Sequence, residues 1–370
     1  MTDVDTDPGT KSVAESAPVA PATVVAPPGP DFAERAARAA ARGPKPVRVV
    51  SARVSIWSRL IEIWRARELF IYLVRKEIKV KYMNSFLGFL WSMLNPALTL
   101  AVFYVLFTYF LPNGYPYFVI YMFSAMLVWN FFQAGLMGGT SSVVVNAGIV
   151  KKVAFPREIL VLASVGASFM FFFYQSIVLA IFMFAFRHAP LWHEMWLLPL
   201  ALVALCVFCA ALAVFLSAVN VYLRDTQHLV EVLLVAWFWA IPTVYAFSGR
   251  VQQSLQRHTI AFIPHTKLIW LYFANPVVPV VMTFQRVFYN DFHPRSTKPG
   301  IVLIHGHSET VAHPLVGWTP AHQDGIGILA YYPIHWFVVA NLIVLGVSML
   351  LFLGALVVFG HLEGNFAEEL

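Results

Sequence analysis

The chain has 370 residues, 59% of them hydrophobic and only 12% charged, with a formal net charge of +6 at pH 7. Soluble domains carry about 25% charged residues, so this composition excludes an ordinary soluble protein. Several apolar runs reach the roughly 20 residues that a helix needs to cross a bilayer, and their length excludes the short alternating strands of an outer-membrane barrel. The sequence therefore predicts an all-α integral membrane protein.

The N-terminal region divides into a tail and an amphipathic segment. Residues 1–50 are rich in Pro and Ala and lack the apolar core of a signal peptide, so we expect a disordered cytosolic tail. In residues 51–85, Trp57, Ile61 and Trp64 recur at helical spacing among arginines. This pattern predicts an interface helix that lies in the membrane surface and ends in the basic segment "RKEIKVKY".

Residues 86–370 form the predicted transmembrane domain. We expect six spanning helices, at Phe86–Phe110, Tyr117–Thr140, Ile159–Phe186, Met195–Val221, Leu229–Phe247 and Ile334–Phe359. Lys and Arg are frequent before the first span and between the second and third, and rare in the short opposite loops, so both termini are expected in the cytosol. Cys206 and Cys209, inside the fourth span, are interpreted as small packing residues.

Between the fifth and sixth spans, residues 248–290 contain two apolar segments that are each too short to cross, separated by Asn275 and Pro276. We predict a re-entrant helix pair that gates a passage on the outer side, because irregular backbone at membrane depth needs protein or water around it. Arg286, a charge at membrane depth, is interpreted as a gate contact, and the alternative is a headgroup anchor.

Residues 291–333 form a polar segment, predicted to be an extracytoplasmic loop insertion. Three histidines in this loop have no fixed ligand spacing, so we interpret them as exposed loop residues rather than a metal site: His305, His307 and His313.

The segment "NAGIVKKVAFPREI" (Asn146–Ile159) places charges between the second and third spans. Apolar Ile149, Val150 and Val153 alternate with these charges before Pro156 turns the chain. Such a pattern is typical of a helix that docks into a groove on a partner. The alternative is an ordinary cytosolic loop whose lysines set the topology.

Five segments in chain order carry a family resemblance. They are "LVRKEIKVKYMNSFLGFLWSMLNPAL" (Leu73–Leu98), "NAGIVKKVAFPREIL", "NVYLRDTQHL" (Asn220–Leu229), "ANPVVPVVMTFQRVFY" (Ala274–Tyr289) and the terminal "EGNFAEEL". Together they resemble the membrane subunits of ABC-2 type exporters for polysaccharides and polyol phosphates. That family includes the permeases for lipid-linked O-antigen, teichoic acid and galactan, and the resemblance covers residues 51–370 apart from the outer loop.

The resemblance implies a homodimeric half-transporter that recruits two copies of a separate ATPase, which would carry ATP and Mg. The implied substrate is a polyprenyl-diphosphate-linked polysaccharide, moved from the cytosol across the bacterial inner membrane, with membrane lipid around the protein and no nucleic acid. The sequence contains no G-x-x-x-x-G-K-[ST] phosphate loop, so ATP chemistry is expected from the partner. No catalytic residue, cofactor or metal is expected in this chain.

The same resemblance assigns roles to groups of residues. ATPase coupling falls to the docking segment, interpreted as a coupling helix, and to the loop after the fourth span: Asn146, Lys151, Lys152, Phe155, Pro156, Arg157, Glu158, Arg224 and Asp225. The substrate entrance falls to Arg75, Lys76, Lys79, Lys81 and Tyr82. Positive-inside topology explains the entrance cations as well, and an N-cap of the fifth span explains Asp225 as well.

Aromatic residues in the spans suit a sugar channel, because aromatic rings hold sugar C–H faces without immobilising hydrogen bonds. The candidates are Trp91, Tyr104, Phe107, Trp129, Phe132, Tyr174, Trp237, Trp239 and Tyr245. The alternative is that these rings fill helix packing or belt the membrane interfaces.

Two other functions fit parts of the sequence. An ABC-2 drug or lipid exporter should lack the interface helix and have fewer channel aromatics. A polytopic glycosyl- or acyltransferase should present an acidic or histidine constellation near the interface, for which Glu194, His188 and His193 are the candidates.

Overall fold

The computed structural model describes most of the chain beyond residue 55, and every described residue belongs to the unit Ser51–Leu370. The described residues are 56–83, 85–88, 90–110, 117–245, 247, 271–289, 301–304, 307–310 and 332–370. Several predictions fall outside them: the tail at 1–50, the first apolar segment of the re-entrant pair before residue 271, and most of the 291–333 loop with His305 and His313.

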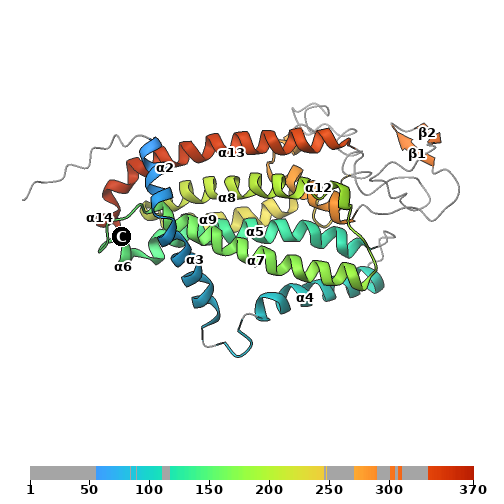
Figure 1. Ribbon diagram of the computed structural model, residues 1–370, viewed down its shortest axis with the longest axis horizontal. Helices are drawn as coiled ribbons and strands as arrows, with labels where there is room; N and C mark the ends of the chain where they lie inside the picture. Colours follow the sequence, from blue (N-terminus) through green and yellow to red (C-terminus); the bar gives the residue numbers. More distant parts are fainter. Residues whose placement is uncertain are drawn as a thin grey trace, which may run out of the picture. The chain divides into compact units, whose positions relative to one another are not determined.

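The described chain is mainly helical, and its long helices run side by side (Figure 1). The long elements are α2 Ile56–Arg65, α3 Arg67–Tyr82, α4 Leu90–Val105 with a π-helical extension Leu106–Phe110, α5 Phe118–Val145, α7 Glu158–Ala185, α8 Leu197–Tyr222, α9 Thr226–Trp239, α12 Val277–Tyr289 and α13 Ile334–Leu362. Short turns of helix are α6 Ala147–Val150, η2 Trp192–Glu194, η4 Glu363–Asn365 and α14 Phe366–Glu369.

Among the described residues, five helices are long and apolar enough to cross a membrane: Leu90–Phe110, Phe118–Val145, Glu158–Ala185, Leu197–Tyr222 and Ile334–Asn365. They confirm the predicted all-helical membrane domain and five of its six spans, with ends shifted by a few residues. α2, α6 and α14 lie together at one end of the bundle, which we call the α6 end, and α12 lies toward the opposite end (Figure 1).

The predicted fifth span is wrong as a continuous helix. α9 has 14 residues and ends at Trp239, so it rises about 21 Å and falls short of a hydrocarbon core of roughly 30 Å. The chain then runs without regular structure through residues 241–245. Pro242 accounts for the break, since proline lacks the N–H that a helix interior requires and disfavours helical backbone at the residue before it.

Buried polar side chains satisfy this broken backbone. The Tyr121 hydroxyl donates to the carbonyls of Pro242 at 3.3 Å and Tyr245 at 3.0 Å, and Gln285 Nε2 donates to the Pro242 carbonyl at 2.6 Å. Tyr121 and Gln285 are both fully buried. Irregular backbone inside a membrane is tolerated only where protein or water supplies such partners.

Small residues bring α5 and α8 into close contact. A Cβ atom built on Gly135 would lie 2.7 Å from Cys209 Sγ, and one on Gly139 would lie 2.6 Å from Ala213 Cβ. Small residues four apart allow membrane helices to approach closely, and van der Waals packing then stabilises the pair. Cys209 therefore is a packing residue, as predicted; both cysteines are free thiols.

The predicted interface helix is two helices, α2 and α3, that meet at Ala66. α2 has no buried residue and exposes Trp57 and Trp64, a distribution that suits the membrane interface predicted for it. α3 packs against α7, where a Cβ on Gly166 would lie 3.0 Å from the side chains of Phe70 and Val74.

A small hairpin lies within the segment predicted to be a loop. β1 (Ile301–Ile304) pairs antiparallel with β2 (His307–Thr310), and Ile304 lies opposite His307 in the register. The β-branched residues of β1 favour a strand, a local signal that the prediction of a polar loop did not use.

Replacing Gly139 by Leu should destabilise the bundle, because the new side chain meets Ala213 at a contact with no room to adjust. Overpacking of this kind costs about 1–3 kcal/mol. Thermal unfolding in detergent, followed by size-exclusion chromatography, measures the effect. Gly354→Leu in α13 is the matched control, since nothing lies within 4 Å of a Cβ at that position. Equal melting temperatures for the two variants would contradict the packing argument.

Candidate coupling site

The α5–α7 connection is a single helical turn followed by an extended segment. α6 ends at Val150, the backbone N–H of Val153 still donates to the Ile149 carbonyl at 3.0 Å, and the chain then runs without helix to Pro156. The predicted docking helix over this segment is therefore too long. Proline disfavours helical backbone at the residue before it, here Phe155, and this accounts for the early end.

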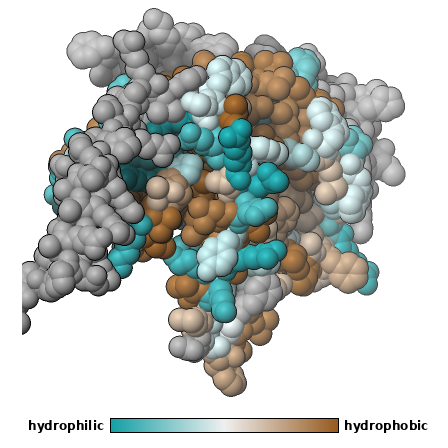
Figure 2. Space-filling view, turned by 60° about the vertical axis from the view of Figure 1, so that its left-hand side comes forward, coloured by the Kyte–Doolittle hydropathy of each residue, from teal (hydrophilic) through white to brown (hydrophobic). Residues whose placement is uncertain are grey.

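The tip of this connection presents two cations and two apolar side chains. Lys151 and Lys152 are exposed, and so are Ile149 and Val153, whereas Phe155 is half-buried against the core. Figure 2 shows hydrophilic and hydrophobic side chains interspersed over the end of the bundle that comes forward in this view. We call residues 149–153 the connection tip.

An ion-pair network lies beneath the connection tip. Arg59 of α2 donates through Nη1 to Glu158 Oε1 and through Nη2 to Glu363 Oε2, the latter at 2.5 Å. Arg157 Nη1 donates to the Glu363 carbonyl at 2.5 Å. Arg59 lies against Gly360, where a Cβ atom would come within 3.0 Å of its guanidinium. The network joins the start of α7 to α2 and to the C-terminal end.

Two residues of the predicted coupling set thus point inward. Glu158 is fully buried, and Arg157 is engaged by Glu363 and lies 5.7 Å from the centre of the Phe366 ring. The Glu158 carboxylate, at the first turn of α7, faces Arg59 and the favourable end of the helix dipole. The sequence did not reveal that Arg59 and Glu363 belong to this site, although Glu363 begins the motif "EGNFAEEL".

The first residue of the predicted coupling set, Asn146, is a buried link to α3. Its Oδ1 accepts from Lys76 Nζ at 2.8 Å, and its Nδ2 donates to the Ser142 carbonyl at 2.8 Å. Lys76, predicted at the substrate entrance, is therefore held by the connection between α5 and α7.

The other predicted entrance residues differ in their exposure. Arg75 and Lys79 are exposed on α3. Lys81 Nζ lies 3.9 Å above the ring of Phe171, and Tyr82 meets the same ring edge-on at 5.9 Å. Arg75 and Lys79 are thus the cations of this set without such a contact among the described residues.

The loop between α8 and α9 lies at the same end. Arg224 and Asp225 are exposed beside a cavity of about 620 Å³ that Glu369 of α14 also borders. Asp225 occupies the N-cap position of α9, but its side chain makes no capping hydrogen bond, so that part of the prediction is wrong. Asn220 Oδ1 accepts the Gln227 N–H at 3.3 Å instead.

Most of the predicted channel aromatics are packed inside the chain. Trp129 and Phe132 are buried and meet Phe238 and Phe208, which favours the alternative that these rings fill helix packing. The other predicted rings with packing partners are Tyr104 on Phe186, Phe107 on Phe118, Tyr174 on Phe171, Trp237 on Phe132 and Tyr245, whose hydroxyl meets that of Tyr272. Trp91 and Trp239 are exposed.

The predicted outer-gate residues hold α12 in place. Asn275 Oδ1 accepts from the Val277 N–H at 3.1 Å and from Trp237 Nε1 at 3.0 Å, so Asn275 caps α12 just before Pro276. The chain bends at this pair, as predicted, and α12 beyond it is almost entirely buried.

Arg286 of α12 is buried in a bidentate pair with Glu194. Its Nε and Nη2 donate to the two carboxylate oxygens at 2.5 and 2.7 Å, and its Nη1 donates to the Tyr332 carbonyl at 2.7 Å. A headgroup anchor is thereby excluded for Arg286. Of the transferase candidates, Glu194 is engaged by Arg286, His193 Nε2 lies 3.8 Å from Glu194 Oε1, and His188 Nε2 lies 2.9 Å from the Phe288 carbonyl oxygen.

Comparisons with known proteins agree with this architecture. The family model of ABC-2 type transporters matches residues 68–289. The O-antigen export system permease protein RfbA of Myxococcus xanthus is 33% identical over 228 residues, which cover 62% of this chain and 83% of the relative. Two Klebsiella pneumoniae proteins of the same name are 25% and 24% identical over 223 residues, which cover 60% of this chain and 81% of each relative.

The matched range runs from the start of α3 to the end of α12 and contains the connection tip, the entrance cations and Arg286. Arg59 and Glu363 lie outside it. The family resemblance found in the sequence is therefore confirmed: this chain belongs to the ABC-2 type transporter family of membrane subunits.

Proposed function

We propose that this chain is the permease subunit of an ATP-driven exporter that moves a polyprenyl-diphosphate-linked polysaccharide from the cytosol across the bacterial inner membrane. Two copies enclose the conduit, and each binds a separate ATPase subunit that carries ATP and Mg. The relatives that are O-antigen export permeases support the substrate class. The observation that carries the coupling part of the proposal is the exposed connection tip next to an ion-pair network centred on the buried carboxylate of Glu158.

The connection tip suits the surface of a partner protein. Two exposed lysines supply electrostatic steering, and exposed Ile149 and Val153 supply apolar area. Because the α6 end then faces the ATPase, it is the cytosolic end, and α2 and α14 lie on that side. The cavity beside Arg224 and Asp225 offers a second contact at the same end.

The network beneath the tip provides a path for force. A displacement of the tip acts on the start of α7, and the Arg59 guanidinium passes it to α2 and to Glu363. α2 has no buried residue, and Arg59 connects it to Glu158 and Glu363, so α2 would move together with the start of α7. We assign α2 the role of an inner gate, and the exposed cations Arg75 and Lys79 that of receiving the diphosphate by charge-assisted hydrogen bonds.

The competing functions have less support. A transferase would need Glu194 or His188 free for proton transfer, but Glu194 forms an ion pair with Arg286 and His188 Nε2 lies 2.9 Å from the Phe288 carbonyl oxygen. A drug or lipid exporter would not need an amphipathic helix of the kind seen in α2, which exposes two tryptophans.

Charge reversal at the connection tip should separate the permease from its ATPase. Lys151→Glu with Lys152→Glu leaves the internal contacts intact, because both side chains are exposed. We expect an ABC ATPase to co-purify with the wild-type chain from native membranes. The double variant should neither co-purify with the ATPase nor support polysaccharide export. Exposed Arg187, between α7 and α8 at the opposite end, is the control as Arg187→Glu. Unchanged export by the double variant would remove the coupling assignment.

Removing the cation of the network should affect stability as well as coupling. Arg59→Gln leaves the buried Glu158 carboxylate without its partner, which costs about 3–5 kcal/mol when a buried pair is broken. The double variant Arg59→Gln, Glu158→Gln should recover much of that loss in thermal unfolding, because no buried charge remains. If the loss of stability in the double variant equals the sum of the losses in the two single variants, Arg59 and Glu158 do not act as a pair.

A further inference from the structure

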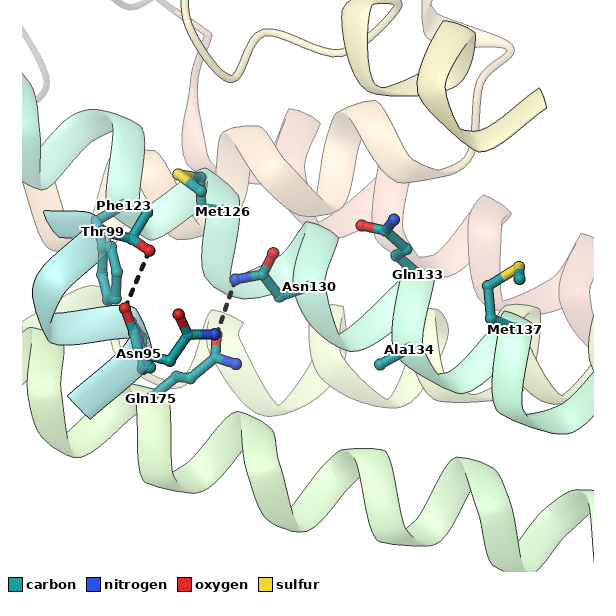
Figure 3. A pocket seen from close by; sticks show the side chains of 10 residues that line it. Asn95, Thr99, Phe123, Met126, Asn130, Gln133, Ala134, Met137 and Gln175 are labelled. Atoms are coloured by element: carbon teal, nitrogen blue, oxygen red, sulfur yellow. Dashed lines mark hydrogen bonds between the residues drawn. The ribbon is translucent and has the colours of Figure 1, made fainter. Parts of the chain in front are cut away.

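A polar cavity interrupts the apolar faces of three spans. It encloses about 460 Å³ between α4, α5 and α7 and is lined by four side-chain carboxamides, from Asn95, Asn130, Gln133 and Gln175, and by the Thr99 hydroxyl. Figure 3 shows Asn130 directed at Gln175, with Gln133 and Met137 farther along α5. This volume lies within the roughly 300–1,000 Å³ of small-molecule sites.

The cavity lies along the one open stripe of α5. Most residues of this helix are buried, and those that are not include Met126, Asn130, Gln133, Met137 and Ser141, spaced three or four apart. This spacing places them on a single face. The open face of the most buried span thus carries the polar side chains of Asn130, Gln133 and Ser141.

Contact with lipid is unfavourable for this face of α5. Transfer of an amide without a hydrogen-bond partner from water to an apolar medium costs about 2–7 kcal/mol of free energy. Asn130 Nδ2 donates to Gln175 Oε1 at 3.1 Å, but no hydrogen bond to a described residue satisfies the side chains of Gln133 and Asn95. The free amides require water or a ligand that can both donate and accept hydrogen bonds.

The chemistry of the lining selects the ligand class. Among the described residues that line the cavity none is charged, so a phosphate or a metal ion has no counter-charge there. Carboxamides are neutral and carry a donor and an acceptor each, which matches the hydroxyl groups of sugars. A second copy of the chain fits less well, because the amides line a hollow between α4, α5 and α7.

We infer that this cavity is a wet, neutral subsite that hydrogen-bonds the hydroxyl groups of sugar units as the polysaccharide passes. The inference rests on the proposed export function and assigns the path to amides of α4, α5 and α7, where sequence analysis had chosen aromatic rings. The diphosphate is received elsewhere, at the exposed cations of α3, so the two ends of the substrate are recognised by different chemistry.

Near-isosteric replacements test the inference. Gln133→Met and Asn130→Leu keep the side-chain size but remove the hydrogen-bonding groups, and Gln133 is exposed with no partner to lose among the described residues. Each should reduce polysaccharide export about 2- to 10-fold, the equivalent of one hydrogen bond, with ATPase co-purification and melting temperature unchanged for Gln133→Met. Gln227→Met in α9, the same replacement outside the cavity, is the control and should export normally.

A cysteine at position 133 distinguishes the possible neighbours of this face. In native membranes, Gln133→Cys should react with a charged, membrane-impermeant methanethiosulfonate, and the reaction should slow in cells that make the polymer. The unmodified chain, with Cys206 and Cys209 inside α8, gives the background. An intermolecular disulfide without labelling would indicate that position 133 contacts a second copy of the chain. If neither the disulfide nor the labelled product forms, lipid covers position 133. Either result overturns the subsite.

Export by the wild-type chain separates this inference from the proposed function. If the wild-type chain exports polysaccharide while Gln133→Met and Asn130→Leu export equally well, the subsite is overturned and the function stands. If deletion of the wild-type gene leaves surface polysaccharide unchanged, the proposed function itself fails.

Discussion

The pair between Arg59 and the buried carboxylate of Glu158 is the interaction on which the α6 end depends. A carboxylate this deeply buried is tolerated only with a partner, and Arg59 supplies one while its second nitrogen reaches Glu363. The guanidinium thereby ties the start of α7, the interface helix α2 and the C-terminal end into one unit. The exposed connection tip stands on this unit, which makes it a firm surface for a docking partner.

A second constraint governs the opposite half of the bundle, where each polar group away from water needs a partner. The backbone released at Pro242 is bonded by Tyr121 and Gln285, and Arg286 is held by Glu194 and the Tyr332 carbonyl. These contacts fix α12 and the broken fifth crossing against α5. The Asn95 and Gln133 amides of the cavity beside α5 make no hydrogen bond to a described residue, and that is why they point to water and to a hydroxyl-bearing ligand.

The spans could be predicted from the sequence because bilayer thickness sets the length of an apolar helix. The family followed from motifs that lie within or next to residues 68–289, apart from the C-terminal one. The directions of side chains could not be predicted as well as the spans. Because α5 is apolar on most faces, its periodicity does not show that Trp129 and Phe132 face inward. The inward direction of the Glu158 side chain could not be predicted, because its partner Arg59 lies 99 residues away, a separation that no local pattern encodes.

The central claim is that a separate ATPase drives this permease through the α5–α7 connection. A photo-crosslinking amino acid at position 152, in the exposed connection tip, tests it most directly in native membranes, with position 187 at the opposite end as the reference. Crosslinking from position 152 alone to an ABC ATPase is the predicted result. No ATPase adduct from position 152, or adducts of equal yield from both positions, would contradict the account.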